Sequence, residues 1–326
     1  MTKVYLAYRL PNTERAQYLI GFAQQIQSLS AMKDEGVIIH SFDGQQKLFV
    51  QDLQNCSPSD FDFKLKEKQW SSTAKTDYLH AFSQIQAAFE AQKCDKVILS
   101  RLSVVPTQES PIQLFERLNQ KYSNTFNYLL FSEEMGCWMG ATPEILVSRK
   151  MEQLQIMSLA GTKAVDAGIE WTAKEKEEQQ YVTDYVLQLL KNHQCENIEA
   201  NGPKTIQAGY VEHLQTILKA QLGTKTNFSQ LLEGLHPTPA VCGIPTPYAK
   251  ELIAEVEQHA RQLYTGFIGI LGREEQTFFV NLRCMELSVG KARLYLGGGI
   301  TAASEAEAEW QETEFKAQTL KAILEN

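Results

Sequence analysis

The order of hydrophobic and polar positions predicts a chain in which helices and strands follow one another without a simple repeat. Apolar residues with helical spacing predict helices at 12–32, 76–93, 172–192, 228–235, 247–263 and 304–324. Short apolar or alternating runs predict strands at 3–9, 36–41, 96–100, 128–131, 137–141, 145–148, 154–159, 266–271, 277–287 and 292–296. The polar segment 57–72 is weakly patterned and is expected to be a loop or a connection between subdomains.

These elements predict one large α/β domain over residues 1–326, of the α+β type, with mostly antiparallel sheets flanked by helices. No low-complexity linker divides the chain. The strands of the last third follow one another without intervening helices, which favours antiparallel pairing. Residues 1–75 carry the least information, and we expect them to complete the sheet.

Composition narrows the possible partners. The net charge of −8 argues against a broad nucleic-acid surface, and no apolar run approaches the length that spans a bilayer. The six cysteines are scattered and form no C-x-x-C pair, and the first residues lack a secretory signal pattern, so we expect a reduced, cytoplasmic protein. The chain also lacks a G-x-G-x-x-G after its first strand, a P-loop and a G-x-S-x-G. Their absence argues against a dinucleotide-binding protein, a P-loop NTPase and an α/β-hydrolase.

Two Glu-x-x-Glu pairs, Glu175/Glu178 and Glu309/Glu312, fall in segments predicted to be helical. Residues three apart on a helix project from nearly the same face, so each pair presents two carboxylates together. If the two helices meet, four carboxylates repel one another unless a cation lies among them. Oxygen ligands that leave room for water suit Mg²⁺. Spacing alone thus permits a magnesium site divided between two helices.

Ordinary explanations for the same pairs exist, and spacing alone favours them. Solvated helix faces often carry such charges. Thr172 and Glu175 have the spacing of a capping box, as do Ser304 and Glu307. Lys316 follows Glu312 by four residues, which is typical of a surface ion pair.

Other segments carry residues that a β-rich core does not need. Gly297-Gly298-Gly299 interrupts a predicted strand, which suggests either a tight turn or close approach of the backbone to a ligand. Gly161-Thr162 ends another strand with small residues whose N–H groups can face an anion. Arg283 falls inside an apolar strand, where a buried arginine needs a carboxylate. The segment 236–245 is too rich in Pro and Gly for a regular element and is expected to be a rigid loop.

Taken in order, these motifs resemble those of the chorismate-utilising enzymes, which include isochorismate, salicylate, anthranilate and aminodeoxychorismate synthases. The motifs are Lys96-Val-Ile-Leu-Ser-Arg, Gly140-Ala-Thr-Pro-Glu, Ser158-Leu-Ala-Gly-Thr, His236-Pro-Thr-Pro-Ala, Tyr264-Thr-Gly-Phe-Ile-Gly, Leu282-Arg-Cys, Gly297-Gly-Gly-Ile and Glu309-Trp-Gln-Glu-Thr-Glu-Phe-Lys. The resemblance covers residues 76–326, the expected catalytic core. It implies that residues 1–75 are an abbreviated, variable N-terminal part and that the protein is a monomer.

The resemblance implies an Mg²⁺ ion between the two acidic helices, bound to the ring carboxylate of chorismate. Glu178 and Glu312 match its direct ligands, and Glu175 and Glu309 match ligands that act through water. The match of the segment 174–178 to the family motif can also be shifted by one residue, which would make Glu177 the ligand in place of Glu178. The family often has a histidine where this chain has Gln179.

The resemblance also implies the substrate contacts. Arg283 and Tyr264 match residues that bind the enolpyruvyl carboxylate. Further positions match the lining of the carboxylate pockets or belong to the Pro-rich loop beside them: Gly161, Thr162, His236, Ala240, Gly297, Gly298, Gly299 and Lys316.

The implied activity is that of an isochorismate synthase, in which water adds at C2 of the ring and the C4 hydroxyl leaves. Lys96 matches the base, provided that burial or nearby charge makes its neutral amine available. Glu144 matches the acid that protonates the departing hydroxyl. Lyase-competent relatives usually have Thr at the position of Ala240, so Ala240 favours a reaction that stops before pyruvate is eliminated. A salicylate synthase and a catalytically silent binding subunit are the alternatives. Menaquinone biosynthesis is the expected use of the product, with a siderophore or separately made salicylate as the other uses.

Overall fold

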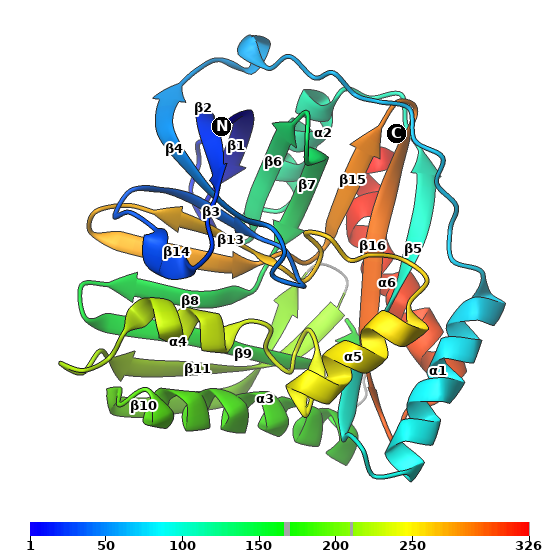
Figure 1. Cartoon of the computed structure of the whole chain (residues 1–326). Coiled ribbons are helices and arrows are strands. Elements are labelled where there is room, and N and C mark those ends of the chain that lie inside the picture. Colours follow the sequence, from blue (N-terminus) through cyan, green and yellow to red (C-terminus); the bar gives the residue numbers. More distant parts are fainter. Residues whose placement is uncertain (166–169, 209–210, 326) are drawn as a thin grey trace.

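The computed structural model describes residues 1–165, 170–208 and 211–325, and Figure 1 shows strands enclosed by helices on two sides. The helices are α1 (Lys75–Glu90), α2 (Pro111–Lys121), α3 (Ala173–Asn192), α4 (Phe228–Leu235), α5 (Thr246–Val256) and α6 (Ala306–Leu324), with short 3-10 helices at Leu29–Ala31 and Pro58–Asp60. No helix within these described ranges is long and apolar enough to cross a membrane.

The strands form one hydrogen-bonded sheet in the order β10-β11-β9-β8-β14-β13-β3-β4-β2-β1-β6-β7-β15-β16-β5-β12. Their bounds are β1 (Thr2–Arg9), β2 (Gln17–Gln25), β3 (Gly36–His40), β4 (Lys47–Asn55), β5 (Lys96–Pro106), β6 (Phe126–Ser132), β7 (Gly136–Thr142), β8 (Ile145–Lys150), β9 (Gln153–Ala164), β10 (Glu196–Ala208), β11 (Val211–Gln221), β12 (Gly243–Ile244), β13 (Phe267–Leu271), β14 (Glu275–Val280), β15 (Cys284–Ser288) and β16 (Lys291–Thr301). The pairings are antiparallel, as the sequence predicted. Strands β1–β4 lie in the middle of this order, so residues 1–75 are integral to the sheet.

The sheet folds over so that its two halves pack face to face. One core cluster joins apolar residues of both halves, among them Val4 and Phe126 from one half and Val37 and Phe279 from the other. The aromatic rings of Phe126 and Phe279 stack at 4.1 Å between centroids. Helices α3 and α4 cover one outer face, and α2 and α6 cover the other. Helices α1 and α5 pack beside β5 (Figure 1).

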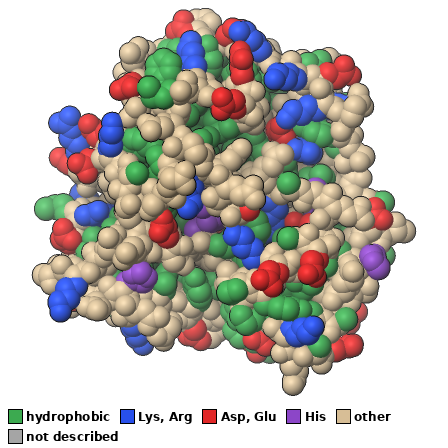
Figure 2. Space-filling model, viewed as in Figure 1, with side chains coloured by type: hydrophobic (Ala, Val, Ile, Leu, Met, Phe, Trp, Pro, Cys, Tyr) green, Lys and Arg blue, Asp and Glu red, His purple; other side chains and the backbone are tan. Residues whose placement is uncertain are grey.

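The surface is consistent with the charge balance of the sequence. Lys and Arg side chains lie interspersed with Asp and Glu across the face shown in Figure 2. A surface that binds a nucleic-acid duplex instead has many Lys and Arg side chains clustered on one face.

The start of α3 follows from a capping box that the sequence predicts. The backbone N–H of Thr172 donates to Glu175 Oε2 at 2.9 Å, which satisfies a donor that the helix leaves free. The second expected box does not form, because α6 begins after Glu305 and Ser304 Oγ accepts instead from the N–H of Thr301 at 3.1 Å.

Several predicted elements differ in the structure. Residues 12–32 are not helical, since β2 occupies Gln17–Gln25 and buries Leu19, Gly21 and Ala23 with a period of two. Helix α5 ends at Val256 and not at residue 263. The strand predicted at 277–287 breaks into β14 and β15, so Arg283 lies between strands, with φ +47°, and not inside one. The weakly patterned segment 57–72 is irregular apart from one 3-10 turn, which confirms the loop interpretation.

Candidate active site

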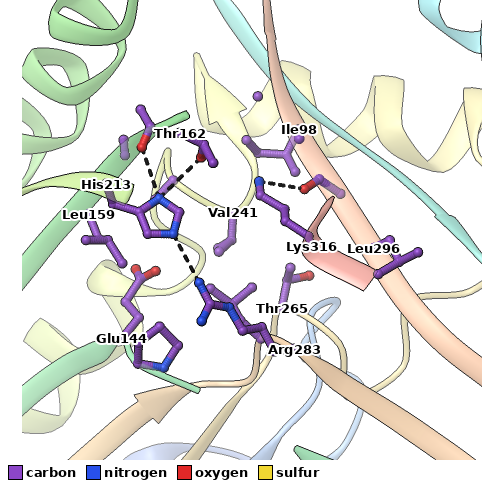
Figure 3. Close-up of a pocket in the computed structure, with 18 of the residues that line it drawn as sticks. Ile98, Glu144, Leu159, Thr162, His213, Val241, Thr265, Arg283, Leu296 and Lys316 are labelled. Carbon is purple, nitrogen blue, oxygen red and sulfur yellow. Dashed lines mark hydrogen bonds between the residues drawn. The ribbon is translucent and has the colours of Figure 1, made fainter. Parts of the chain in front are cut away.

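The break between β14 and β15 opens onto a cavity that collects most of the predicted site residues (Figure 3). Strands β9, β11 and β16, helices α3 and α6 and the loop after α4 all contribute to its wall. The lining residues are Ile98, Pro143, Glu144, Leu159, Ala160, Gly161, Thr162, Glu178, His213, Ala240, Val241, Tyr264, Thr265, Leu282, Arg283, Tyr295, Leu296, Gly297, Gly298, Gly299 and Lys316.

Glu144 is a buried carboxyl in this wall, placed by the Thr-Pro turn that joins β7 to β8. Burial raises its pKa from 4.5 to about 8, although the positive charges of Lys96, Arg283 and Lys316 act in the opposite direction. The side chain is therefore largely protonated at neutral pH and is able to donate a proton.

His213 also lies in this wall and is a site residue that the sequence interpretation missed. Its Nδ1 lies 3.0 Å from the carbonyl oxygen of Gly161 and 3.2 Å from Thr162 Oγ1, and its Nε2 lies 3.1 Å from Arg283 Nη2 (Figure 3). A carbonyl only accepts, so Nδ1 carries the proton and Nε2 accepts from Arg283. Burial, helped by Arg283 and Lys316, lowers the pKa of His213 to about 3, so the ring is neutral and holds the guanidinium in place. Its only signal in the sequence was a single histidine in the mixed segment Val211–Gln221, which is the pattern of an ordinary strand.

The glycine run lets other groups approach strand β16 closely, and it does not interrupt the strand as expected. A Cβ on Gly297 would lie 2.6 Å from the Tyr264 hydroxyl oxygen, and one on Gly298 would lie 3.4 Å from both Glu309 Oε2 and Glu312 Oε1. A Cβ on Gly299 would collide with Glu178. Side chains at these positions would push the acidic helices away from the strand.

The acidic residues of α3 differ in their placement. Glu178 lines the cavity, and its Oε1 lies 2.9 Å from Lys96 Nζ, an ion pair that is not a well-directed hydrogen bond. Glu177 is exposed and accepts a hydrogen bond from Tyr181, so Glu178 and not Glu177 faces the cavity. Glu175 caps α3 through Oε2, and its Cβ and backbone pack against Gly161.

The acidic residues of α6 are paired with lysines. Glu309 is only 2% exposed, and its Oε1 lies 2.5 Å from Lys174 Nζ. Glu312 Oε1 lies 2.7 Å from Lys316 Nζ, which also donates to the carbonyl oxygen of Gly297 at 2.9 Å. The solvated-face interpretation is wrong for Glu309, although the expected Glu312–Lys316 pair is present.

These carboxylates fit a cation. Glu309 Oε2 is buried and has no hydrogen-bond partner. Burial, followed by the negative charge of Glu312, raises the pKa of Glu309. A buried, unpaired carboxylate oxygen beside a second carboxylate is costly unless a cation satisfies it. Among the residues that the structure describes, no three His, Cys, Asp or Glu side chains lie close enough together to hold a metal ion as they stand.

Besides Glu175, Glu309 and Glu312, two further predicted residues lie outside the cavity wall. Lys96 is fully buried and lies directly behind Glu178 and Gly299. The structure does not bring His236 to the cavity. Its ring instead packs edge-on against His40 and Phe267, at 4.9 and 5.1 Å between centroids, beside a separate hollow.

A cavity with Arg283 and Lys316 in its wall and acidic helices beside it is typical of an enzyme that binds a small carboxylate. The model of the chorismate binding enzyme family matches residues 24–325. The chain belongs to this family.

Relatives and solved structures agree with this assignment. The isochorismate synthase DhbC of Bacillus subtilis is 30% identical over 299 residues, which cover 83% of this chain and 75% of that protein. The menaquinone-specific isochorismate synthase MenF of Escherichia coli has a TM-score of 0.82 at 20% identity, covering 99% of this chain and 89% of that one. Anthranilate synthase component I of Streptococcus pneumoniae has a TM-score of 0.73 at 16% identity, covering 98% and 92%. The expected single-domain chorismate-binding fold is confirmed.

Proposed function

We propose that this protein is an isochorismate synthase that converts chorismate to isochorismate with the help of Mg²⁺. The observation that carries the proposal is Glu144, a buried carboxyl in the cavity wall whose pKa is raised to about 8. A hydroxide is a poor leaving group, and a protonated carboxyl beside it supplies the proton that lets it depart as water. A binding subunit has no need of such a group.

Chorismate carries two carboxylates, and the cavity offers cations for them. Arg283 keeps its charge at neutral pH, although burial lowers its pKa to about 10. His213 fixes the direction of the guanidinium. We assign Arg283 and Tyr264 to the enolpyruvyl carboxylate. Gly161, Thr162, the glycine run 297–299 and Lys316 line the rest of the cavity and suit the ring carboxylate.

We assign the metal to Glu178 and Glu312, with Glu309 and Glu175 as outer ligands through water. The unpartnered Oε2 of Glu309 supports this assignment. Bound there, Mg²⁺ would neutralise the ring carboxylate and the acidic side chains around it. Because α3 and α6 come from distant parts of the sequence, the fold itself brings the two halves of this site together.

The reaction requires a base as well as an acid. Lys96 takes a proton from the water that attacks C2, and Glu144 gives its proton to the hydroxyl that leaves C4. An ammonium cannot accept a proton, so Lys96 acts in its neutral form, which becomes available once Glu178, now 2.9 Å from its Nζ, turns away. The proton count balances, because one proton is removed at C2 and one is supplied at C4.

Ala240 decides between two enzymatic outcomes. It lines the cavity with a methyl group and offers no hydroxyl to the substrate. This supports a reaction that ends at isochorismate and not at salicylate and pyruvate. We infer menaquinone biosynthesis as the use of the product, since the similar Escherichia coli structure is that of a menaquinone-specific enzyme. We also infer a monomer in the cytoplasm, where the six free cysteines stay reduced.

One assay tests the proposal. Purified protein is incubated with chorismate and Mg²⁺, and isochorismate, salicylate and pyruvate are resolved by chromatography. We expect isochorismate at the expense of chorismate until equilibrium, without pyruvate. Pyruvate formed in step with chorismate loss would identify a salicylate synthase, and the absence of turnover would favour the silent subunit.

A further inference from the structure

Lys174 is a cation placed among the acidic side chains that we assign to the metal. It lies in the first turn of α3, and its Nζ is 2.5 Å from Glu309 Oε1. Glu309 belongs to α6 and lies next to Glu312, because a Cβ on Gly298 would be 3.4 Å from an oxygen of each. An ammonium from α3 thus lies against the carboxylates of α6.

We propose that Lys174 is a built-in competitor of Mg²⁺: its ammonium neutralises Glu309 in the metal-free protein, has to leave when the ion binds, and so sets the Mg²⁺ affinity. This inference rests on the metal site of the proposed function. It adds a residue with a defined role to that site, and a reason why the metal-free site stays intact.

Buried Glu309 needs a positively charged partner. Glu309 is 2% exposed, and a buried carboxylate without a counter-ion is strongly destabilising. Lys174 supplies that counter-ion. Two cations bound to one carboxylate repel each other strongly in a site shielded from water. A divalent ion held near Glu309 therefore favours a Lys174 that has moved away.

The three lysines near the acidic residues differ in how easily they can move into solvent. Lys96 is fully buried, and Lys316 is held by the carbonyl oxygen of Gly297 as well as by Glu312. The Lys174 side chain is 24% exposed and belongs to the first turn of a helix, so rotation of its side chain carries the ammonium into solvent. Among the three lysines, Lys174 is therefore best placed to exchange with a metal.

Calorimetric titration with Mg²⁺, without chorismate, tests the inference. Lys174→Gln removes the competitor, and Lys174→Arg keeps a cation there. Lys176→Gln removes the same charge from an exposed position two residues along α3. We expect Lys174→Gln to bind Mg²⁺ at least about tenfold more tightly than the unaltered protein, and the other two variants to change affinity by less than about threefold.

The results separate this inference from the proposed function. If the unaltered protein binds Mg²⁺ and Lys174→Gln binds it no more tightly, the competitor role is wrong and the metal site stands. If neither binds Mg²⁺, the metal site and the competitor role are both wrong.

Thermal unfolding gives a second readout that needs no turnover. Without Mg²⁺, Lys174→Gln should have a lower Tm than Lys176→Gln, because Glu309 loses its partner. Saturating Mg²⁺ should remove most of that difference. Equal Tm values for the two variants without Mg²⁺ would contradict the role of Lys174 as the counter-ion of Glu309.

Discussion

Lys96 and Glu178 form an ion pair inside the protein, with 2.9 Å between Nζ and Oε1. Lys96 belongs to β5 and Glu178 to α3, and Gly299 of β16 leaves the space in which they meet. The proposed base therefore touches a proposed metal ligand. The two roles are separable only with variants that remove one side chain at a time.

Replacement of Lys96 by alanine should remove the base. We expect kcat to fall by about a hundredfold to ten-thousandfold, as for the loss of a general base, while chorismate still binds in the presence of Mg²⁺. Steady-state kinetics and calorimetric titration with chorismate measure the two effects. Lys93→Ala, at an exposed position near the start of the same strand, is the control and should be unaltered. Loss of binding in Lys96→Ala would show that Lys96 holds the substrate and is not the base.

The raised pKa of Glu144 predicts the alkaline limb of the pH profile. Activity requires the protonated carboxyl, so kcat/KM should fall as pH rises through about 8. Glu144→Gln should lose about a hundredfold to ten-thousandfold in kcat and should also lose this limb. A pH–rate profile of both proteins makes the comparison. An alkaline limb that survives in Glu144→Gln belongs to another group.

The same group makes stability depend on pH. Between pH 4.5 and about 8 the unfolded chain has released the Glu144 proton while the folded protein keeps it. The free energy of unfolding should therefore decrease as pH rises across this window. Glu144→Gln removes that contribution, so its stability relative to the unaltered protein should improve from pH 5 to 8. Urea denaturation at several pH values tests this, with the exposed Glu251→Gln as the control that should show no such trend.

Replacement of Arg261 should mainly lower the stability of the fold. Its guanidinium pairs with buried Glu257 at 2.6 Å and donates to the carbonyl oxygens of Val241 and Ile98, two residues of the cavity wall. Arg261→Met leaves a buried carboxylate unpaired and should cost about 3–5 kcal/mol in the free energy of unfolding. Arg273→Met breaks a surface pair with Glu35 and should cost less than about 1 kcal/mol. Similar losses in the two variants by chemical denaturation would contradict the structural role of Arg261.

Ala240 should control where the reaction ends. Ala240→Thr adds a hydroxyl to the cavity wall at the position where lyase-competent relatives carry it. We expect this variant to release pyruvate and salicylate from chorismate, slowly, while the unaltered protein releases neither. Coupled detection of pyruvate measures the difference. A variant that makes isochorismate at the normal rate without pyruvate would show that Ala240 does not set the outcome.

The sequence predicted most of the helices and strands but missed several strands, among them β2 and β4 in the middle of the sheet. Helices α1, α3 and α6 carry long apolar stripes, so their positions agree with the prediction to within a few residues. Helix α2 and strands β2, β4, β10, β11 and the two-residue β12 were not predicted. Strand β10 has almost no alternation, because it lies at the edge of the sheet and exposes many of its residues. Strand β2 has apolar spacing that also fits a helix, and only pairing with β1 and β4 decides its conformation.

The site was predictable through motifs more than through patterning. Eleven predicted residues line the cavity, some at the ends of strands or in turns and others inside β16, α3 and α6. The lysine partners of Glu178 and Glu309 were not predictable, since they depend on how α3 and α6 approach β5 and β16. His213 was missed because nothing in its local sequence distinguishes it from a histidine of an ordinary strand.

The most direct test of the central claim uses water labelled with heavy oxygen. We expect each isochorismate molecule formed from unlabelled chorismate to gain one labelled oxygen, located by mass spectrometry at the C2 hydroxyl. Isochorismate formed without label would mean that the original hydroxyl moves within the molecule. That result would contradict the roles of Lys96 in activating water and of Glu144 in releasing the C4 hydroxyl.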